Sequence, residues 1–127
     1  MAPAMFKIAN NYSVPEQMEI EMALETVRRV SFTNLPCRQN VFYACMTLSE
    51  LKKLNNRCNR KQGFHGNVYE IDGKSFGPFD TLAAFTRWSD DLLQRSRCYW
   101  RGLETPQPLH EYLVTLPVRI GRQVGTL

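Results

Sequence analysis

Residues 66–79 read G-N-V-Y-E-I-D-G-K-S-F-G-P-F, and the expected fold class depends on this stretch. Within residues 68–71, Val68, Tyr69 and Ile71 are β-branched or aromatic, which is typical of a strand. The Asp72-Gly73 pair that follows is typical of a two-residue hairpin turn, because both residues accept a positive φ angle. We therefore expect a second strand over residues 74–79 that pairs antiparallel with the first.

Two more strands are expected on either side of this hairpin. Residues 40–45 (N-V-F-Y-A-C) are rich in aromatic and β-branched residues and predict a buried strand. Residues 112–120 predict a last strand, in which Pro117 indicates an edge position or a bulge.

Three helices complete the expected set. The first covers residues 14–30, begins at Ser13 as its cap, and buries an apolar stripe of Val14, Met18, Met22, Val27 and Val30. The second follows the capping box Thr47-Leu48-Ser49-Glu50 and buries Leu48, Leu51, Leu54 and Cys58. The third begins at Asp80, runs past Tyr99 and ends at Gly102. The order α-β-α-β-β-α-β predicts an α+β fold with a single small mixed or antiparallel sheet.

Length and composition predict one domain. The chain has 127 residues, of which 43% are hydrophobic and 22% are charged, as expected for a folded domain with one core. We expect this domain to span residues 1–127, with 1–12 loose or at a sheet edge and 122–127 loose. No apolar run approaches the roughly 18 residues of a membrane span, and no signal-peptide pattern is present. The expected location is the cytoplasm, without a membrane partner.

The four cysteines and two histidines do not form a recognisable site. Cys37, Cys45, Cys58 and Cys98 lack a C-x-x-C spacing, and we expect them to be reduced thiols. His65 and His110 have no second ligand at a metal spacing, so no metal is expected. The sequence also lacks a glycine-rich phosphate loop, a nucleophile elbow and the H-E-x-x-H motif. No cofactor is therefore certain from motifs alone.

Basic residues are concentrated in one segment of a chain whose net charge is +4. The segment from residue 52 to residue 61 has no acidic residue and contains Lys52, Lys53, Arg57, Arg60 and Lys61. Such a helix could bind an acidic protein surface, or it could neutralise the phosphates of a nucleic acid. The alternative is an ordinary solvated helix face.

Several short segments resemble a known family. They are residues 21–40, the strand V-F-Y-A-C, the run G-N-V-Y-E-I-D-G, the helix end R-S-R-C-Y-W-R-G and the final H-E-Y-L-V-T-L-P-V-R-I. In order and spacing they resemble the C-terminal two thirds of small bacterial and phage domains similar to ADP-ribosyltransferases.

The resemblance implies a site for NAD. Tyr43 matches the residue that borders the nicotinamide pocket, and Glu111 matches the glutamate that stabilises the oxocarbenium-like sugar. Arg38 would contact a phosphate or line the pocket. The family's early strand carries histidine or arginine to hold the NAD, whereas this chain has Lys7 there. Alternatively, Glu111 is a rim charge, Tyr43 belongs to the core and Arg38 forms an ion pair in a loop.

Two functional hypotheses follow. In the first, the chain is an NAD-dependent ADP-ribosyltransferase, or a relic of one, that modifies a protein or a nucleic acid. In the second, it is a small inhibitor-like module, of the kind found in phages and mobile elements, that binds and modulates a host protein or protein–nucleic-acid complex. The lysine at position 7 favours the second hypothesis, on a fold related to the first.

Overall fold

The computed structural model describes residues 2–5, 15–58 and 66–127. It has an α+β fold, which confirms the expected class. Within these residues, four strands pair antiparallel throughout, in the closed order β1-β2-β4-β3. The elements in chain order are β1 (Ala2–Met5), α1 (Pro15–Ser31), a 3-10 helix (Arg38–Asn40), β2 (Val41–Ala44), α2 (Leu48–Cys58), β3 (Asn67–Asp80), α3 (Thr81–Phe85), α4 (Leu92–Arg101) and β4 (His110–Thr126).

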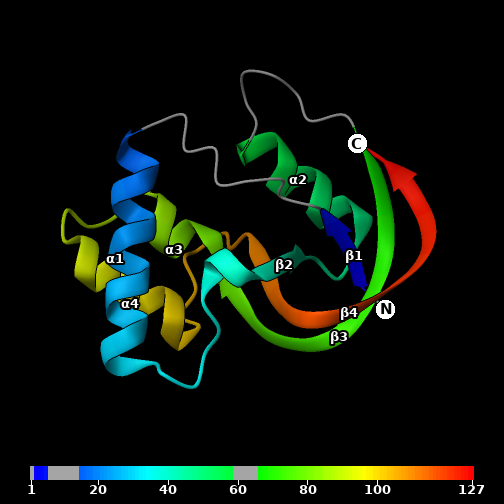
Figure 1. Ribbon diagram of the computed structural model, residues 1–127. Helices are drawn as coiled ribbons and strands as arrows, with labels where there is room; N and C mark the ends of the chain where they lie inside the picture. Colours follow the sequence, from blue (N-terminus) through cyan, green and yellow to red (C-terminus); the bar gives the residue numbers. More distant parts are fainter. Residues whose placement is uncertain (1, 6–14, 59–65) are drawn as a thin grey trace.

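The helices are divided between two parts of the sheet. Figure 1 shows β3 and β4 side by side as a long curved ribbon, with α1, α3 and α4 grouped together at one end. One core lies between these three helices and the strands, and its centre includes Leu24, Tyr99 and Leu113. A second core lies under α2, where Leu51 and Leu54 pack with Cys45 and Val68.

The expected hairpin at Asp72-Gly73 is wrong, because both residues lie within the continuous strand β3. Asp72 pairs with Arg119 of β4, and Gly73 does not have the positive φ that a hairpin turn requires. A Cβ atom on Gly73 would come within 2.9 Å of Val114 Cγ1 and 3.3 Å of the Pro117 carbonyl oxygen. Glycine is present here because β3 approaches β4 closely, which is its other common role in strands.

Pro117 occupies the kind of position that its sequence context predicts. The register between β3 and β4 shifts between the Asp72–Arg119 pair and the Lys74–Thr115 pair, so β4 is irregular there. Because proline cannot donate to a strand ladder, it is tolerated where the pairing is interrupted.

The third expected helix is divided in two. Asp80 caps α3 by accepting a hydrogen bond from the Leu82 N–H, as expected, but α3 ends at Phe85. Asp91 then caps α4 through the N–H groups of Leu93 and Gln94. The expected stop at Gly102 is confirmed, since this residue has a φ of 73° and closes the last turn.

The buried face of α1 differs from the expected stripe. Met18, Met22 and Val30 are exposed, whereas Ile20 and Leu24 are buried together with Val27. The helical spacing i, i+4, i+7 fits this second stripe, which faces α3 and α4. The expected cap, Ser13, lies outside the described residues.

Both expected loose ends include strand residues. Ala2–Met5 forms β1, which pairs with β2 on one side and with β3 on the other, so it is not an edge. At the other end, β4 continues to Thr126 and the Leu127 N–H donates to the Gly66 carbonyl. The expectation of a loose segment over residues 122–127 is therefore wrong. Among the described helices, none has the length and apolar character needed to cross a membrane.

Candidate functional site

A buried arginine lies at the centre of the candidate site. Arg38 is only 4% exposed and belongs to the 3-10 helix that precedes β2. Its Nε and Nη2 donate to the two carboxylate oxygens of Glu21 on α1, at 2.9 and 3.0 Å. Its Nη1 donates to Oε1 of Glu111 on β4 at 2.5 Å. One guanidinium therefore joins two buried carboxylates, and the pair with Glu21 has the forked geometry that makes such contacts strong.

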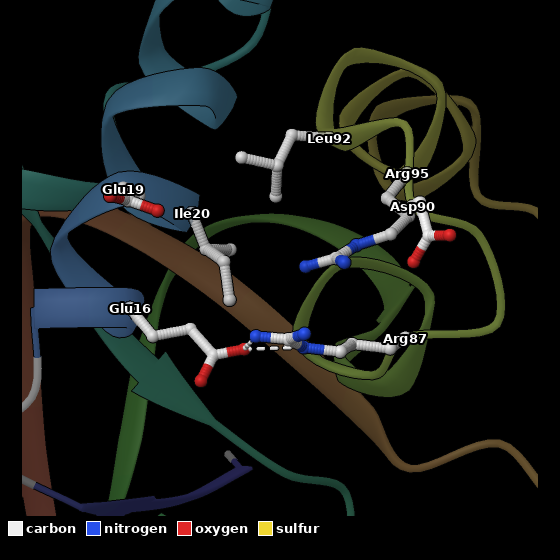
Figure 2. Close-up of a pocket in the computed structure, with 7 residues that line it drawn as sticks. All are labelled: Glu16, Glu19, Ile20, Arg87, Asp90, Leu92 and Arg95. Carbon is white, nitrogen blue, oxygen red and sulfur yellow. Dashed lines mark hydrogen bonds and ion pairs between the residues drawn. The ribbon is translucent and has the colours of Figure 1, made fainter.

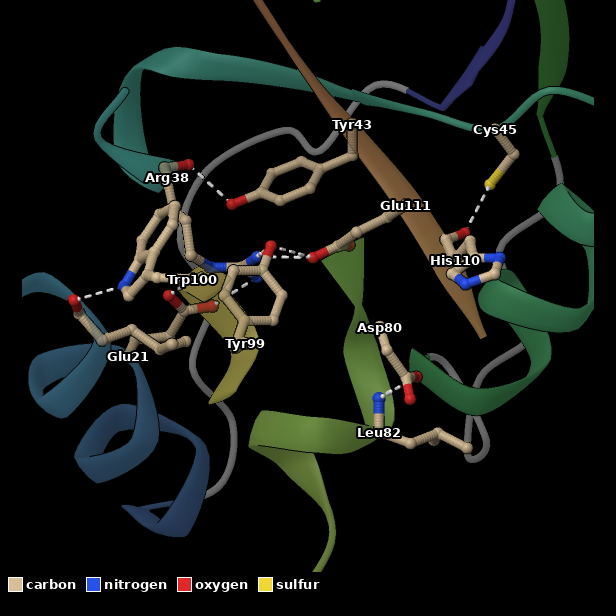
Figure 3. Close-up of polar contacts among 11 residues, drawn as sticks. Glu21, Arg38, Tyr43, Cys45, Asp80, Leu82, Tyr99, Trp100, His110 and Glu111 are labelled. Carbon is tan, nitrogen blue, oxygen red and sulfur yellow. Dashed lines mark hydrogen bonds and ion pairs between the residues drawn. The ribbon is translucent and has the colours of Figure 1, made fainter. Parts of the chain in front are cut away.

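Aromatic side chains surround this guanidinium. The Tyr99 hydroxyl accepts from Arg38 Nη1 at 2.5 Å and donates to Glu111 Oε1 at 2.6 Å. The Tyr43 hydroxyl donates to the Arg38 carbonyl oxygen at 2.6 Å (Figure 3). The guanidinium carbon lies 4.9 Å from the Tyr43 ring centre, 5.1 Å from Tyr99 and 5.4 Å from Phe85. The rings add cation–π attraction and exclude water from the ion pairs.

The strand register places two of these residues on one face of the sheet. Tyr43 of β2 pairs with Leu113 of β4, and successive side chains on a strand point to opposite faces. Glu111 is two residues from Leu113 and therefore shares its face, which is also the face of Tyr43. Both side chains are buried there, at 5% exposed for Tyr43 and 3% for Glu111.

The ionisation of the cluster follows from its burial and its charges. Burial by itself lowers the pKa of Arg38, but Tyr43, Tyr99, Glu111 and Glu21 outweigh it and hold the pKa well above its usual value. Burial raises the pKa of the Tyr99 phenol, which the neighbouring Glu111 carboxylate raises further against the influence of Arg38. Arg38 is thus charged and Tyr99 is a neutral hydrogen-bond donor at physiological pH.

The structure brings together the three residues that the resemblance singles out. Arg38, Tyr43 and Glu111 belong to one hydrogen-bonded cluster although up to 73 positions separate them. The cluster also contains Glu21 and Tyr99, which sequence reasoning missed. A signal for Glu21 exists, because it lies three residues before Leu24 on the buried side of α1, where an acidic residue needs a partner.

Two cavities lie within the described part of the chain, at the positions given below, and the cluster lines neither of them. The larger, of about 630 Å³, is bordered by α3, α4 and the connections that follow them. The smaller, of about 160 Å³, lies between α1 and the segment from Arg87 to Arg95. Glu111 is too buried to be a rim charge, and Arg38 satisfies two carboxylates rather than a phosphate. As it stands, this arrangement stabilises the packing of α1 and α4 against the sheet.

The basic segment is only partly described. Lys52 and Lys53 are exposed on α2, opposite the buried Leu51 and Leu54, as expected for the solvent face. The backbone of Arg57 belongs to α2, while its side chain, Arg60 and Lys61 lie outside the described part of the chain, as do Lys7 and His65.

The cysteine and histidine side chains that the structure describes form no further site. Cys37 and Cys98 form no disulfide with a described residue, and the buried Cys45 Sγ donates to the His110 carbonyl at 3.6 Å. His110 itself pairs with Glu104 at 2.7 Å. Within residues 2–5, 15–58 and 66–127, no three histidine, cysteine or acidic side chains are grouped to hold a metal ion.

The fold and the cluster define a small α+β domain with a closed antiparallel sheet and an internal arginine–carboxylate network. The chain belongs to the family described as "Protein of unknown function (DUF2441)", whose model matches residues 3–125. No curated protein matches the chain.

Proposed function

We propose that this protein is a small binding module that attaches to a host protein or protein–nucleic-acid complex and modulates it. The exposed basic face of α2, which begins with Lys52 and Lys53, would be its docking surface, and an acidic surface would be the partner. The thiols of Cys37 and Cys98, which form no disulfide with a described residue, support a reducing compartment such as the cytoplasm.

One observation about ion pairs supports this proposal. Among the described residues, most exposed arginines outside α2 already have a carboxylate partner; they are Arg29, Arg87, Arg119 and Arg122. Lys52 and Lys53 form no ion pair with any described residue. Their charge remains available to an external anion, which steers association and increases its rate.

Reversing both charges should weaken binding. We expect the double variant Lys52→Glu/Lys53→Glu to bind its partner about tenfold less tightly at low salt, because two cation–anion contacts become repulsive. The measurement is capture from host lysate at increasing salt, with the captured protein identified and its affinity then determined. The loss should diminish as salt screens the contacts.

The matched control reverses two other exposed basic residues that form no ion pair with a described residue. Arg97→Glu/Arg101→Glu on α4 changes the net charge by the same amount, away from α2. Equal losses in the two double variants would mean that net charge, and not α2, governs binding. Loss of capture after nuclease treatment would instead favour the nucleic-acid hypothesis.

A second candidate function is NAD-dependent ADP-ribosyl transfer. It is favoured by the contact of Arg38 and Glu111 beside Tyr43, since the resemblance implies roles for these same three residues. A fixed carboxylate opposes the positive charge that develops on the ribose when the nicotinamide bond breaks. For this reaction, Glu111 would have to become accessible to NAD.

Glu111→Gln tests this candidate. If it holds, NAD raises the melting temperature of the wild-type protein, which also consumes NAD, and the variant consumes none. The circular dichroism spectrum of the variant shows whether it is still folded. Equal and negligible consumption by both proteins, without a thermal shift, would remove the candidate.

A further inference from the structure

The larger of the two cavities has a mainly apolar lining and a size that suits a small organic molecule. This cavity of about 630 Å³ lies between α3, α4 and the connections that follow them. Its apolar side chains include Leu82, Ala83, Trp88, Leu103 and Pro106. Ligand sites in proteins commonly have this size and this kind of wall. The smaller cavity differs, because its lining is mostly charged and Glu16 already pairs with Arg87 there (Figure 2).

Two large apolar side chains of this lining remain in contact with water. Trp88 is 47% exposed and Leu103 is 50% exposed. Exposed apolar groups around a concave surface are typical of a binding site, because a ligand that covers them removes apolar surface from water. The cavity therefore offers apolar contact that the protein does not itself use.

Hydrogen bonds fix the walls of the cavity. The Trp88 indole N–H donates to the Ala83 carbonyl at 2.7 Å, which holds the indole ring against α3. The loop after α4 is attached through the buried Asp80, whose Oδ2 accepts from the N–H and the hydroxyl of Thr105 at 2.7 Å each. A site whose walls are already ordered loses less conformational entropy when a ligand binds.

The charge of the lining favours a cationic ligand. Among the described residues that line the cavity, Glu104 carries a charge and no lysine, arginine or histidine is present. Glu104 Oε1 lies 2.7 Å from His110 Nε2, so Oε2 can accept a hydrogen bond from a ligand. The hydroxyl groups of Thr86 and Thr105 already donate within the protein, and towards a ligand they can only accept. A ligand that donates hydrogen bonds and carries a positive charge complements these groups.

We propose that this cavity binds a small amphiphilic amine, which is a ligand with an apolar ring system and a protonated amino group. The ring system would lie against Trp88, Leu103 and Pro106, and the ammonium group would donate to Glu104. An anionic ligand would be repelled by Glu104. The cavity is separate from the basic face of α2, so this site does not depend on the function proposed above.

Calorimetric titration of the full chain with three compounds of similar shape tests this proposal. They are naphthylethylamine, naphthylethanol and naphthaleneacetate, which share the ring system and carry a positive charge, no charge and a negative charge. We expect the amine to bind about fivefold more tightly than the alcohol and about tenfold more tightly than the carboxylate, because only the amine gains a charged contact with Glu104.

The variant Glu104→Gln should remove this preference. The Glu104 side chain is 52% exposed and its pair with His110 is near the surface, so the substitution costs little stability. We expect the variant to bind the amine and the alcohol with similar affinity, and to bind the carboxylate more tightly than the wild type does. A preference for the amine that persists in this variant would overturn the proposed site.

A matched pair of leucine variants locates the binding. Leu103 lines the cavity, whereas Leu93 of α4 is similarly exposed, at 44%, and does not line it. We expect Leu103→Ala to weaken the binding of the amine about fourfold, because the wall loses apolar surface, and Leu93→Ala to leave it unchanged. The proposal is overturned if the two variants weaken binding equally, if the alcohol or the carboxylate binds the wild type as tightly as the amine does, or if no compound binds at millimolar concentration.

Discussion

Replacing Arg38 with methionine is expected to lower the free energy of unfolding by about 3–5 kcal/mol. The substitution would leave the carboxylates of Glu21 and Glu111 buried and without their common cation. Three aromatic rings also pack around the guanidinium and would lose that contact. Urea denaturation at pH 7 measures the loss, and Arg29→Met is the control, because Arg29 makes only an exposed pair with Glu25.

A triple variant separates the charge effect from loss of packing. In Glu21→Gln/Arg38→Met/Glu111→Gln, no buried charge of the cluster remains. We expect this variant to regain much of the stability that Arg38→Met loses, because hydrophobic and neutral groups often replace a buried ion network at little cost. If the triple variant is less stable than Arg38→Met, uncompensated charge is not the cause of the loss. If Arg38→Met costs no more than Arg29→Met, the cluster does not hold the fold together.

Replacing Asp80 with asparagine is expected to lower the free energy of unfolding by about 2–4 kcal/mol at pH 7. Asp80 is almost completely buried and connects three segments. Its Oδ1 accepts from the N–H groups of Leu82 and Leu109, at 3.0 Å each, and its Oδ2 accepts from the Thr105 N–H and hydroxyl at 2.7 Å each. An asparagine amide would place a donor where Thr105 already donates, so about two contacts would be lost.

The pH dependence gives this prediction a second readout. Burial raises the pKa of Asp80, but the hydrogen bonds from Thr105, Leu109 and Leu82 outweigh it and hold the pKa below its usual value near 4. The carboxylate therefore stabilises the fold fully above about pH 4, and this contribution is lost as the pH falls through the folded-state pKa. The difference in unfolding free energy between wild type and Asp80→Asn should therefore become smaller as the pH falls below about 4.

A titration of unfolding free energies from pH 7 to pH 2 tests this narrowing. Glu25 also contributes in acid, because its hydrogen bond with Arg28 lowers its pKa to about 2, but this contribution is present in both proteins and cancels. Asp91→Asn is the control, since Asp91 caps α4 at the surface and asparagine caps a helix about as well, so this change should cost little. A difference between wild type and Asp80→Asn that is constant down to pH 2 would contradict the assigned role.

The sequence identified three residues of the buried cluster but not all of its members or contacts. The resemblance singled out Arg38, Tyr43 and Glu111, and these residues do belong to one cluster. The sequence pattern could not find Tyr99, because a tyrosine at a core spacing on α4 looks like ordinary packing. Nor could the sequence pattern show that Arg38 forms ion pairs with two carboxylates, since this depends on which helix packs against which strand.

The sequence alone determined the features that depend on short-range chemistry. The capping contacts of Thr47 and Asp80, the stop at Gly102 and the buried face of α2 all follow from residues within a few positions of each other. The α+β class follows as well, because the periods of apolar residues differ between helices and strands.

Only the tertiary structure decided whether residues 66–79 turn back or continue. Asp72-Gly73 is compatible with both a hairpin and a strand, and the choice depends on β4, which approaches Gly73 from more than 40 positions away. The same applies to the buried charges. Whether an arginine such as Arg38 has a carboxylate partner depends on long-range packing, because Glu21 and Glu111 lie on elements far from it in the sequence.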